Sequence, residues 1–222
     1  MTNLFSIFDP ATSSFLSLNW LSFFIFIYMF PYKMWLTPSR YISIMTYLTD
    51  YLFSQFKPIT KKMQFILIVS ITYFIFIMFN NVMGLFPYIF TASSHMVFTL
   101  SLAFMSWLAL MLYGWLNNYS NLLVHMIPQG TPYILMPFMV IIETISNLIR
   151  PGTLAVRLAA NMIAGHLLMV LLSNALANSS MYIFSLVFTA QMALTLLEAA
   201  VSFIQAYVFS VLVTLYMDEF AN

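Results

Sequence analysis

Residues 133–177 read YILMPFMVIIETISNLIRPGTLAVRLAANMIAGHLLMVLLSNALA, and residues 182–216 read YIFSLVFTAQMALTLLEAAVSFIQAYVFSVLVTLY. These two apolar stretches decide the fold, because a membrane-spanning helix needs only about 20 such residues. A helix of about 40 residues is about 60 Å long, twice the thickness of the hydrocarbon core. The sequence therefore predicts two long helices that tilt strongly, lie partly in the membrane plane or break, with Pro151-Gly152 as the expected kink.

The composition of the whole chain also indicates a protein that lies in a lipid membrane. Of its 222 residues, 63% are hydrophobic and 6% are charged, whereas a soluble domain carries about 25% charged residues. The seven lysines and arginines form no basic patch with interleaved aromatic residues, so no nucleic-acid partner is expected. The absence of cysteine excludes disulfides and thiolate metal sites, and three isolated histidines give no reason to expect a metal centre or a cofactor.

The rest of the chain contains three further apolar stretches and one amphipathic stretch. Single spans are expected at about residues 15–35, 64–86 and 95–116, the last two forming a hairpin. Residues 38–63 combine Arg40, Asp50 and three lysines with apolar residues at helical spacing. This pattern favours an amphipathic helix on the membrane surface, with a hydrophilic loop as the alternative. The predicted fold is an all-α polytopic membrane protein, a single domain over residues 1–222 with about five membrane helices and one interfacial helix.

The basic residues predict how the chain is oriented across the membrane. Five of the seven fall between Lys33 and Lys62, a connection that the positive-inside rule places on the electrically negative side. The amino terminus then faces the positive side. Five crossings bring the carboxyl terminus, with Asp218 and Glu219, to the negative side.

Ionisable residues well inside the predicted spans are few; they are concentrated in the two long stretches, and the earlier spans carry essentially none. Such residues are costly in lipid, so each is a candidate functional residue. They are Glu143, Arg150, Arg157, His166 and Glu198. At about 100° per residue, one helical stripe contains Glu143, Asn147, Arg150, Leu154, Arg157 and Asn161, whereas His166 lies on the opposite face. On the last helix a polar line recurs at steps of three and four: Gln191, Thr195, Glu198, Ser202 and Gln205.

Arg157 is the hardest of these residues to explain as packing. It lies far from any predicted interface, and its guanidinium keeps its charge in proteins, so it must find an anion or water. A purely structural ion pair with Glu143 or Glu198 is the alternative to a functional role.

Structural roles also remain open for other residues of the two long stretches. Arg150 could snorkel to a lipid headgroup, and His166 or Gln205 alone could be hydrogen-bonded packing residues. A group of small residues allows a neighbouring helix to approach closely: Ala155, Ala159, Ala160, Ala164 and Gly165.

Two segments make the sequence specific: IRPGTLAVRLAANMIAGHLL at residues 149–168 and LLEAAVSFIQAYVFSVLVTLY at residues 196–216. They resemble the two signature segments of the subunit a family of F-type ATP synthases. The resemblance covers the whole chain and is to the mitochondrial form, and the opening MTNLFSIFDP is similar to arthropod members. The residues that match the family's proton path are the essential arginine Arg157, its neighbouring amide Asn161, and Glu143, His166, Glu198 and Gln205.

The resemblance implies a stationary subunit that lies beside a rotor ring of subunit c. Such a subunit offers two offset half-channels, separated by Arg157, which couple proton flow to rotation and ATP synthesis. His166 and Glu198 would line the half-channel from the positive side, and Glu143, with Ser146 as a secondary candidate, would line the negative-side path. Two further secondary candidates are Arg150 and Ser202.

The resemblance also implies partners and a location. The expected location is the mitochondrial inner membrane, crossed several times, with the amino terminus on the intermembrane-space side and the carboxyl terminus on the matrix side. The other expected partners are further membrane-sector and peripheral-stalk subunits and the lipid bilayer. The sequence has no GxxxxGK[ST] loop, so we expect no nucleotide site and no catalysis by this chain itself.

Two other classes of protein share some of these features. An ion-coupled secondary transporter has broken helices and midplane charges, but it usually shows paired repeats, and none is visible in this sequence. A structural membrane subunit of a respiratory complex would use the buried charges only to hold helices together. Co-purification with a rotor ring would favour the ATP synthase interpretation over both.

Overall fold

The computed structural model of the chain describes residues 4–12, 16–25, 27, 30–31, 35–60, 64–117, 119–127, 132–177 and 180–221. Within these residues the chain consists of helices, without a strand. The 3₁₀ helices are η1 (Leu4–Phe8), η2 (Leu18–Phe24), η3 (Ala92–Ser94) and η4 (Tyr133–Leu135). The α-helices are α2 (Arg40–Phe56), α3 (Gln64–Gly84), α4 (Met96–Asn117), α5 (Tyr119–His125), α6 (Met136–Ala177) and α7 (Met181–Ala221).

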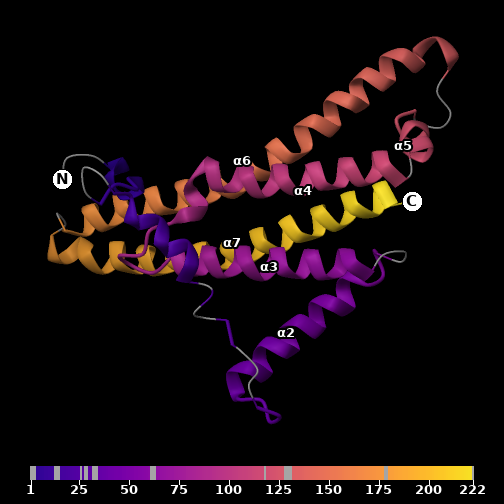
Figure 1. The fold of residues 1–222 in the computed structure, drawn as a ribbon. Coiled ribbons are helices and arrows are strands. Elements are labelled where there is room, and N and C mark those ends of the chain that lie inside the picture. Colours follow the sequence, from indigo (N-terminus) through magenta and orange to yellow (C-terminus); the bar gives the residue numbers. More distant parts are fainter. Residues whose placement is uncertain are drawn as a thin grey trace.

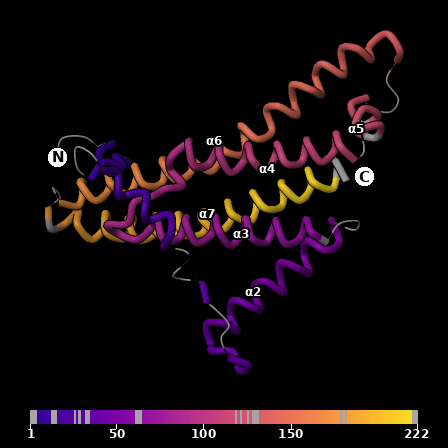
Figure 2. Tube along the Cα trace, viewed as in Figure 1, coloured from indigo at the N-terminus to yellow at the C-terminus, as the bar shows by residue number. Residues whose placement is uncertain are grey.

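The helices α3, α4, α6 and α7 form one bundle. Each of the four is long and apolar enough to cross a membrane, which confirms the prediction of an all-α membrane protein. In Figures 1 and 2, α3 runs beside α7 and α4 runs beside α6. The helix η1 and the end of α7 lie at opposite ends of the bundle (Figure 1). Which end faces which side of the membrane stays a prediction.

The first predicted span, residues 15–35, is covered only in part by the described residues. The described part contains η2, whose Trp20 packs on Phe90 with ring centroids 5.6 Å apart. Phe23 of the same helix packs on Phe76 of α3 at 5.2 Å. These contacts place η2 against α3 and against the turn that precedes α4, and a complete first span stays a prediction.

The helix α2 is amphipathic, as the sequence pattern predicts. Its first turn is capped by Ser39, whose Oγ accepts a hydrogen bond from the backbone N–H of Ile42 at 3.3 Å. Its buried residues Met45, Leu52 and Phe56 recur at helical spacing on one face, and the helix contacts α3. In Figure 1, α2 slants away from the bundle. Its position at the membrane surface stays a prediction.

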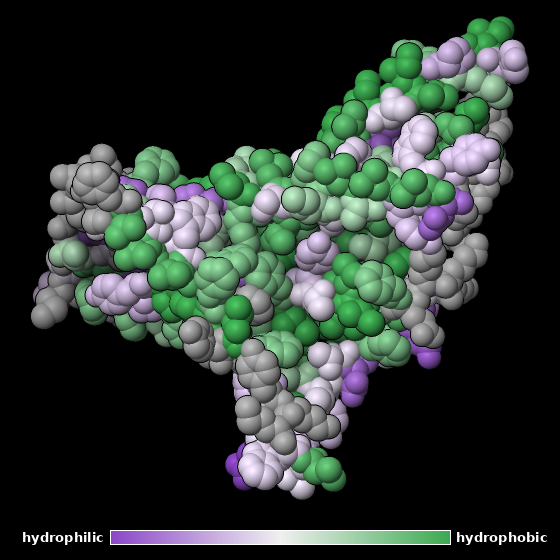
Figure 3. Space-filling model, viewed as in Figure 1, coloured by the Kyte–Doolittle hydropathy of each residue, from purple (hydrophilic) through white to green (hydrophobic). Residues whose placement is uncertain are grey.

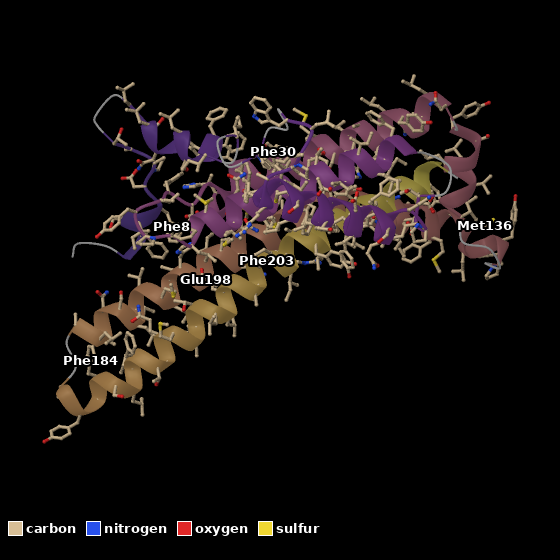
Figure 4. All side chains as sticks on the ribbon, turned by 90° about the horizontal axis from the view of Figure 1, so that it is seen from below. Phe8, Phe30, Met136, Phe184, Glu198 and Phe203 are labelled. Carbon is tan, nitrogen blue, oxygen red and sulfur yellow. The ribbon has the colours of Figure 1, made fainter. Side chains whose placement is uncertain are left out.

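The helices α6 and α7 are the longest elements, with 42 and 41 residues. Pro151 lies inside α6, and because proline has no N–H, the backbone carbonyl of Asn147 loses its usual helical donor. The first half of α6 slants away from α4, and the second half runs beside α7 (Figure 1). Figure 4 shows the α6–α7 hairpin, with Phe184 near its closed end, projecting beyond the other helices. Both long helices therefore present surface that this chain does not cover.

The core lies between α3 and α7, where Ile77, Phe209 and Val213 are almost completely buried. On α6, Ala159 is buried whereas Ala160 is exposed, so one row of small residues packs inward and another faces outward. Figure 3 shows hydrophobic side chains over much of the visible face of the bundle. Such a surface fits a bundle surrounded by lipid.

Candidate functional site

The buried acid of α7 faces the histidine of α6. Glu198 is 5% exposed, and its Oε1 lies 3.9 Å from Nε2 of His166. This distance is too long for a hydrogen bond. Within the described part of the chain, the two carboxylate oxygens of Glu198 have no hydrogen-bond partner. Nε2 of His166 also has none there. Buried polar atoms in native proteins are almost always paired with protein or water, so the pair calls for a further polar partner.

A glycine makes room for the Glu198 side chain. A Cβ atom placed on Gly165 would lie 2.5 Å from Oε1 and 2.8 Å from Cδ of Glu198. Any larger residue at this position would push the carboxylate away. The close approach of α6 and α7 predicted from the small residues is therefore used here to seat an acid rather than only to pack two helices.

Glu198 is one of the residues that line a cavity of about 180 Å³ between α6 and α7. The lining residues are Asn161, Ala164, Gly165, Leu168 and Met169 of α6, and Leu194, Leu197, Glu198 and Val201 of α7. Three of them, Ala164, Leu168 and Leu197, are also exposed on the outer surface. The cavity thus lies between the residue that carries the buried acid and the outward side of the hairpin, and Asn161 lines the same cavity.

An aromatic residue from the start of the chain reaches this site. The ring of Phe8 in η1 meets the ring of His166 edge to face, with centroids 6.4 Å apart. Figure 4 shows Phe8 near Glu198 and the α6–α7 pair. Sequence reasoning missed this residue, because nothing in the opening segment distinguishes Phe8 from the many other phenylalanines.

Arg157 lies on the outward face of α6 and is exposed. It makes no hydrogen bond or ion pair with the residues that the structure describes. The structural alternative, a pair with Glu143 or Glu198, is thus not formed, since the acid on α6 contacts Arg150 and the acid on α7 faces His166. Arg157 lies seven residues, or two helical turns, before Ala164 at the rim of the cavity, so the two share one face.

Arg150 joins a second group of charged and aromatic residues. Its Nη2 donates to Oε1 of Glu143 at 3.4 Å, and its Cζ lies 5.1 Å from the centroid of the Tyr216 ring on α7. Ser146 is close in sequence, but its Oγ donates to the backbone carbonyl of Glu143 at 2.8 Å. The secondary candidate Arg150 therefore contacts the Glu143 carboxylate, whereas Ser146 satisfies the helix backbone.

The remaining predicted residues lie along the buried face of α7. Ser202 is 1% exposed, and its Oγ donates to the carbonyl of Ala199 at 2.7 Å. Gln205 is half-buried and makes no hydrogen bond with the described residues. Asn81 of α3, which sequence reasoning overlooked, is fully buried and donates from Nδ2 to the carbonyl of Ser202 at 3.4 Å. Two consecutive asparagines in an apolar span were the signal that could have identified it.

No group of three or more histidines, cysteines or acids that could hold a metal ion occurs among the described residues. The chemistry that this arrangement offers is the transfer of protons, with an acid and a histidine facing each other inside and a permanent cation outside.

Comparison with known proteins gives one consistent result. The sequence profile of the family described as ATP synthase A chain matches residues 12–218. The chain is 54% identical to "ATP synthase subunit a" of Anopheles gambiae over 225 residues and 54% identical to that of Drosophila simulans over 221 residues. It is 53% identical to that of Locusta migratoria over 222 residues. Each alignment covers 99% of this chain and 99% of the relative.

Proposed function

The chain belongs to the ATP synthase A chain family, and from this membership we propose that it is the stationary proton-conducting subunit beside a rotor ring of subunit c. Its place is the membrane sector of an F-type ATP synthase. In this role it provides two offset half-channels and catalyses no nucleotide chemistry, so it couples proton flow to rotation while ATP forms elsewhere in the complex.

One observation carries the proposal: the cavity that Glu198 lines reaches the same outward face on which Arg157 is exposed. A charged side chain facing lipid near the membrane centre costs several kcal/mol, so a surface of this kind needs a partner outside the chain. A ring carboxylate moving past the face would meet the Glu198 cavity and Arg157 at two positions, two helical turns apart.

The physical role of Arg157 follows from its permanent charge. A ring carboxylate crosses lipid protonated, because an unpaired ion there is expensive. Beside the guanidinium the ionised form is stabilised, so the carboxylate gives up its proton at this point. The same positive charge repels protons that would pass directly between the half-channels. Protons then cross only when the ring turns.

The inner residues divide between the two half-channels. His166 and Glu198, with Asn161 on the cavity wall, serve the path from the positive side, and Gln205 lies further along the same helix. Glu143, with Ser146 nearby, serves the negative-side path. Each proton that falls through about 100 mV supplies about 2.3 kcal/mol, so several protons are needed for each ATP.

The location and partners follow from the relatives and the apolar helices. The animal relatives and the four candidate spans fit a multi-pass protein of the mitochondrial inner membrane. We place the amino terminus in the intermembrane space and the carboxyl terminus in the matrix. Besides the ring of subunit c, the surfaces left open by the long hairpin would contact other membrane-sector and peripheral-stalk subunits and the lipid bilayer.

The test is ATP-driven proton pumping by the whole complex in vesicles. Arg157→Ala should abolish coupled pumping while the complex still assembles, because the exposed side chain makes no contact that holds the described fold together. Arg40→Ala, at the start of α2, is the matched control and should pump normally. Retained pumping in Arg157→Ala would overturn the proposal.

A further inference from the structure

A second charged cluster lies in the first half of α6, away from the Glu198 cavity. It consists of Glu143, Arg150 and Tyr216, with Asn147 between the two charged residues on the same helical stripe. Glu143 and Arg150 are 29% and 25% exposed, so part of each side chain lies at the surface of this chain. The proton path proposed above uses Glu143 but gives no function to the other three residues.

The orientation of Arg150 is specific. Its guanidinium donates back along α6 to the Glu143 carboxylate at 3.4 Å and at the same time lies over the Tyr216 ring of α7 at 5.1 Å. An arginine that only snorkels to lipid headgroups extends toward the interface. Arg150 instead makes directed contacts with an acid on its own helix and a ring on the neighbouring helix.

Among the described residues, the part of α6 between Glu143 and Arg150 also has hydrogen-bond acceptors without their usual partner, both of them at Asn147. Asn147 is 7% exposed, and its Oδ1 has no hydrogen-bond partner among the described residues. Because residue 151 is a proline, the backbone carbonyl of Asn147 also lacks the N–H that a regular helix would supply. Two acceptors thus lie at one position, next to a residue with several N–H donors.

We propose that Arg150, held over the Tyr216 ring, is a positioning residue for proton release: it fixes the Glu143 carboxylate at the negative-side end of the path and balances its charge. The inference rests on the proposed function, because it assigns a partner to the acid of that path. Arginine suits the role, since it stays protonated, presents several donors and stacks on an aromatic face. A carboxylate that the guanidinium holds in one orientation presents the same oxygen to each arriving proton.

The test is a double-mutant cycle on proton flux through the intact complex in vesicles under a clamped potential. Arg150→Gln should slow the flux about two- to fivefold, as expected for a partly exposed ion pair. In a Glu143→Gln background, Arg150→Gln should slow the flux no further, because the carboxylate that Arg150 holds is already gone. Arg150→Lys should restore the flux only in part, since the charge is kept but the fork of donors and the stacking on the ring are lost. Arg40→Gln is the matched control.

Several outcomes would overturn the inference. An unchanged flux in Arg150→Gln would show that this residue only anchors the helix, and effects that multiply in the double variant would show that it acts independently of Glu143. If Arg150→Gln does not assemble, Tyr216→Leu carries the same cycle, with Tyr216→Phe as the control that keeps the ring. Arg157→Ala in parallel separates the two proposals, since pumping by that variant would refute the coupling function whatever Arg150 does.

Discussion

The substitution Gly165→Ala tests the proton path with the smallest possible change. The added Cβ would lie 2.5 Å from Oε1 of Glu198, 0.9 Å short of the 3.4 Å at which ordinary contact begins. The carboxylate is the movable part, because it ends a flexible side chain while Gly165 is fixed in the helix. The acid must therefore shift by about 1 Å relative to His166, and the helix backbone should stay in place.

The expected result is a slow but assembled complex. In the interior of a helix, alanine is favoured over glycine by about 1 kcal/mol, so the amount of assembled complex should not fall. A reacting group displaced by about 1 Å can lose about 100-fold in rate, and we expect proton flux to fall between about tenfold and that limit. The assay is passive and ATP-driven proton flux in vesicles, normalised to the amount of complex.

The same helix supplies a matched control. A Cβ atom on Gly152 would meet nothing within 4 Å, so Gly152→Ala should leave the flux unchanged while making the same change in helix propensity. If Gly165→Ala conducts as well as Gly152→Ala, the position of the Glu198 carboxylate does not limit proton transfer. That result would refute the role given to the cavity.

Two further predictions concern the same pair of helices. Glu198→Gln should slow proton uptake from the positive side about 100-fold, because an amide cannot exchange the proton; an unchanged flux would count against this assignment. Substitutions at Ala159 and Ala160 test the inward and outward rows of small residues on α6. Ala159→Leu overpacks a buried position and should lower stability by about 1–3 kcal/mol. The measurement is the melting temperature of the complex, which should fall. Ala160→Leu should leave stability within about 0.5 kcal/mol while slowing rotation against the ring, and equal behaviour of the two variants would contradict the inward and outward rows.

Much of the fold could be predicted because a membrane limits the choices. Apolar stretches of sufficient length must be helices in lipid, and α3, α4, α6 and α7 overlap the last four expected spans. The short helix α5 was not predicted, because the polar residues around Tyr119 look like a loop. It contacts α4, and such a contact cannot be read from hydropathy.

The candidate site was predictable in its residues but not in its contacts. Projection on a straight helix placed Arg157 on one stripe with Asn147 and Leu154, yet the latter two are buried and Arg157 is exposed. Arg157 lies at the edge of that stripe, and the side of a helix that is covered depends on its neighbours. The contact of Arg150 with Tyr216 joins two helices, so it depends on their relative rotation and cannot be read from spacing.

The placement of the cation and the acid is what the proposed function requires if protons cross by rotation rather than by direct transfer. His166 follows Arg157 by nine residues, which separates them by half a turn around α6 and about 14 Å along its axis. A proton at the inner pair therefore has no short route to an anion held by Arg157. The cavity reaches the outward face instead at Ala164 and Leu168. In the proposed function, a ring carboxylate would take the proton there and move along that face before it met Arg157.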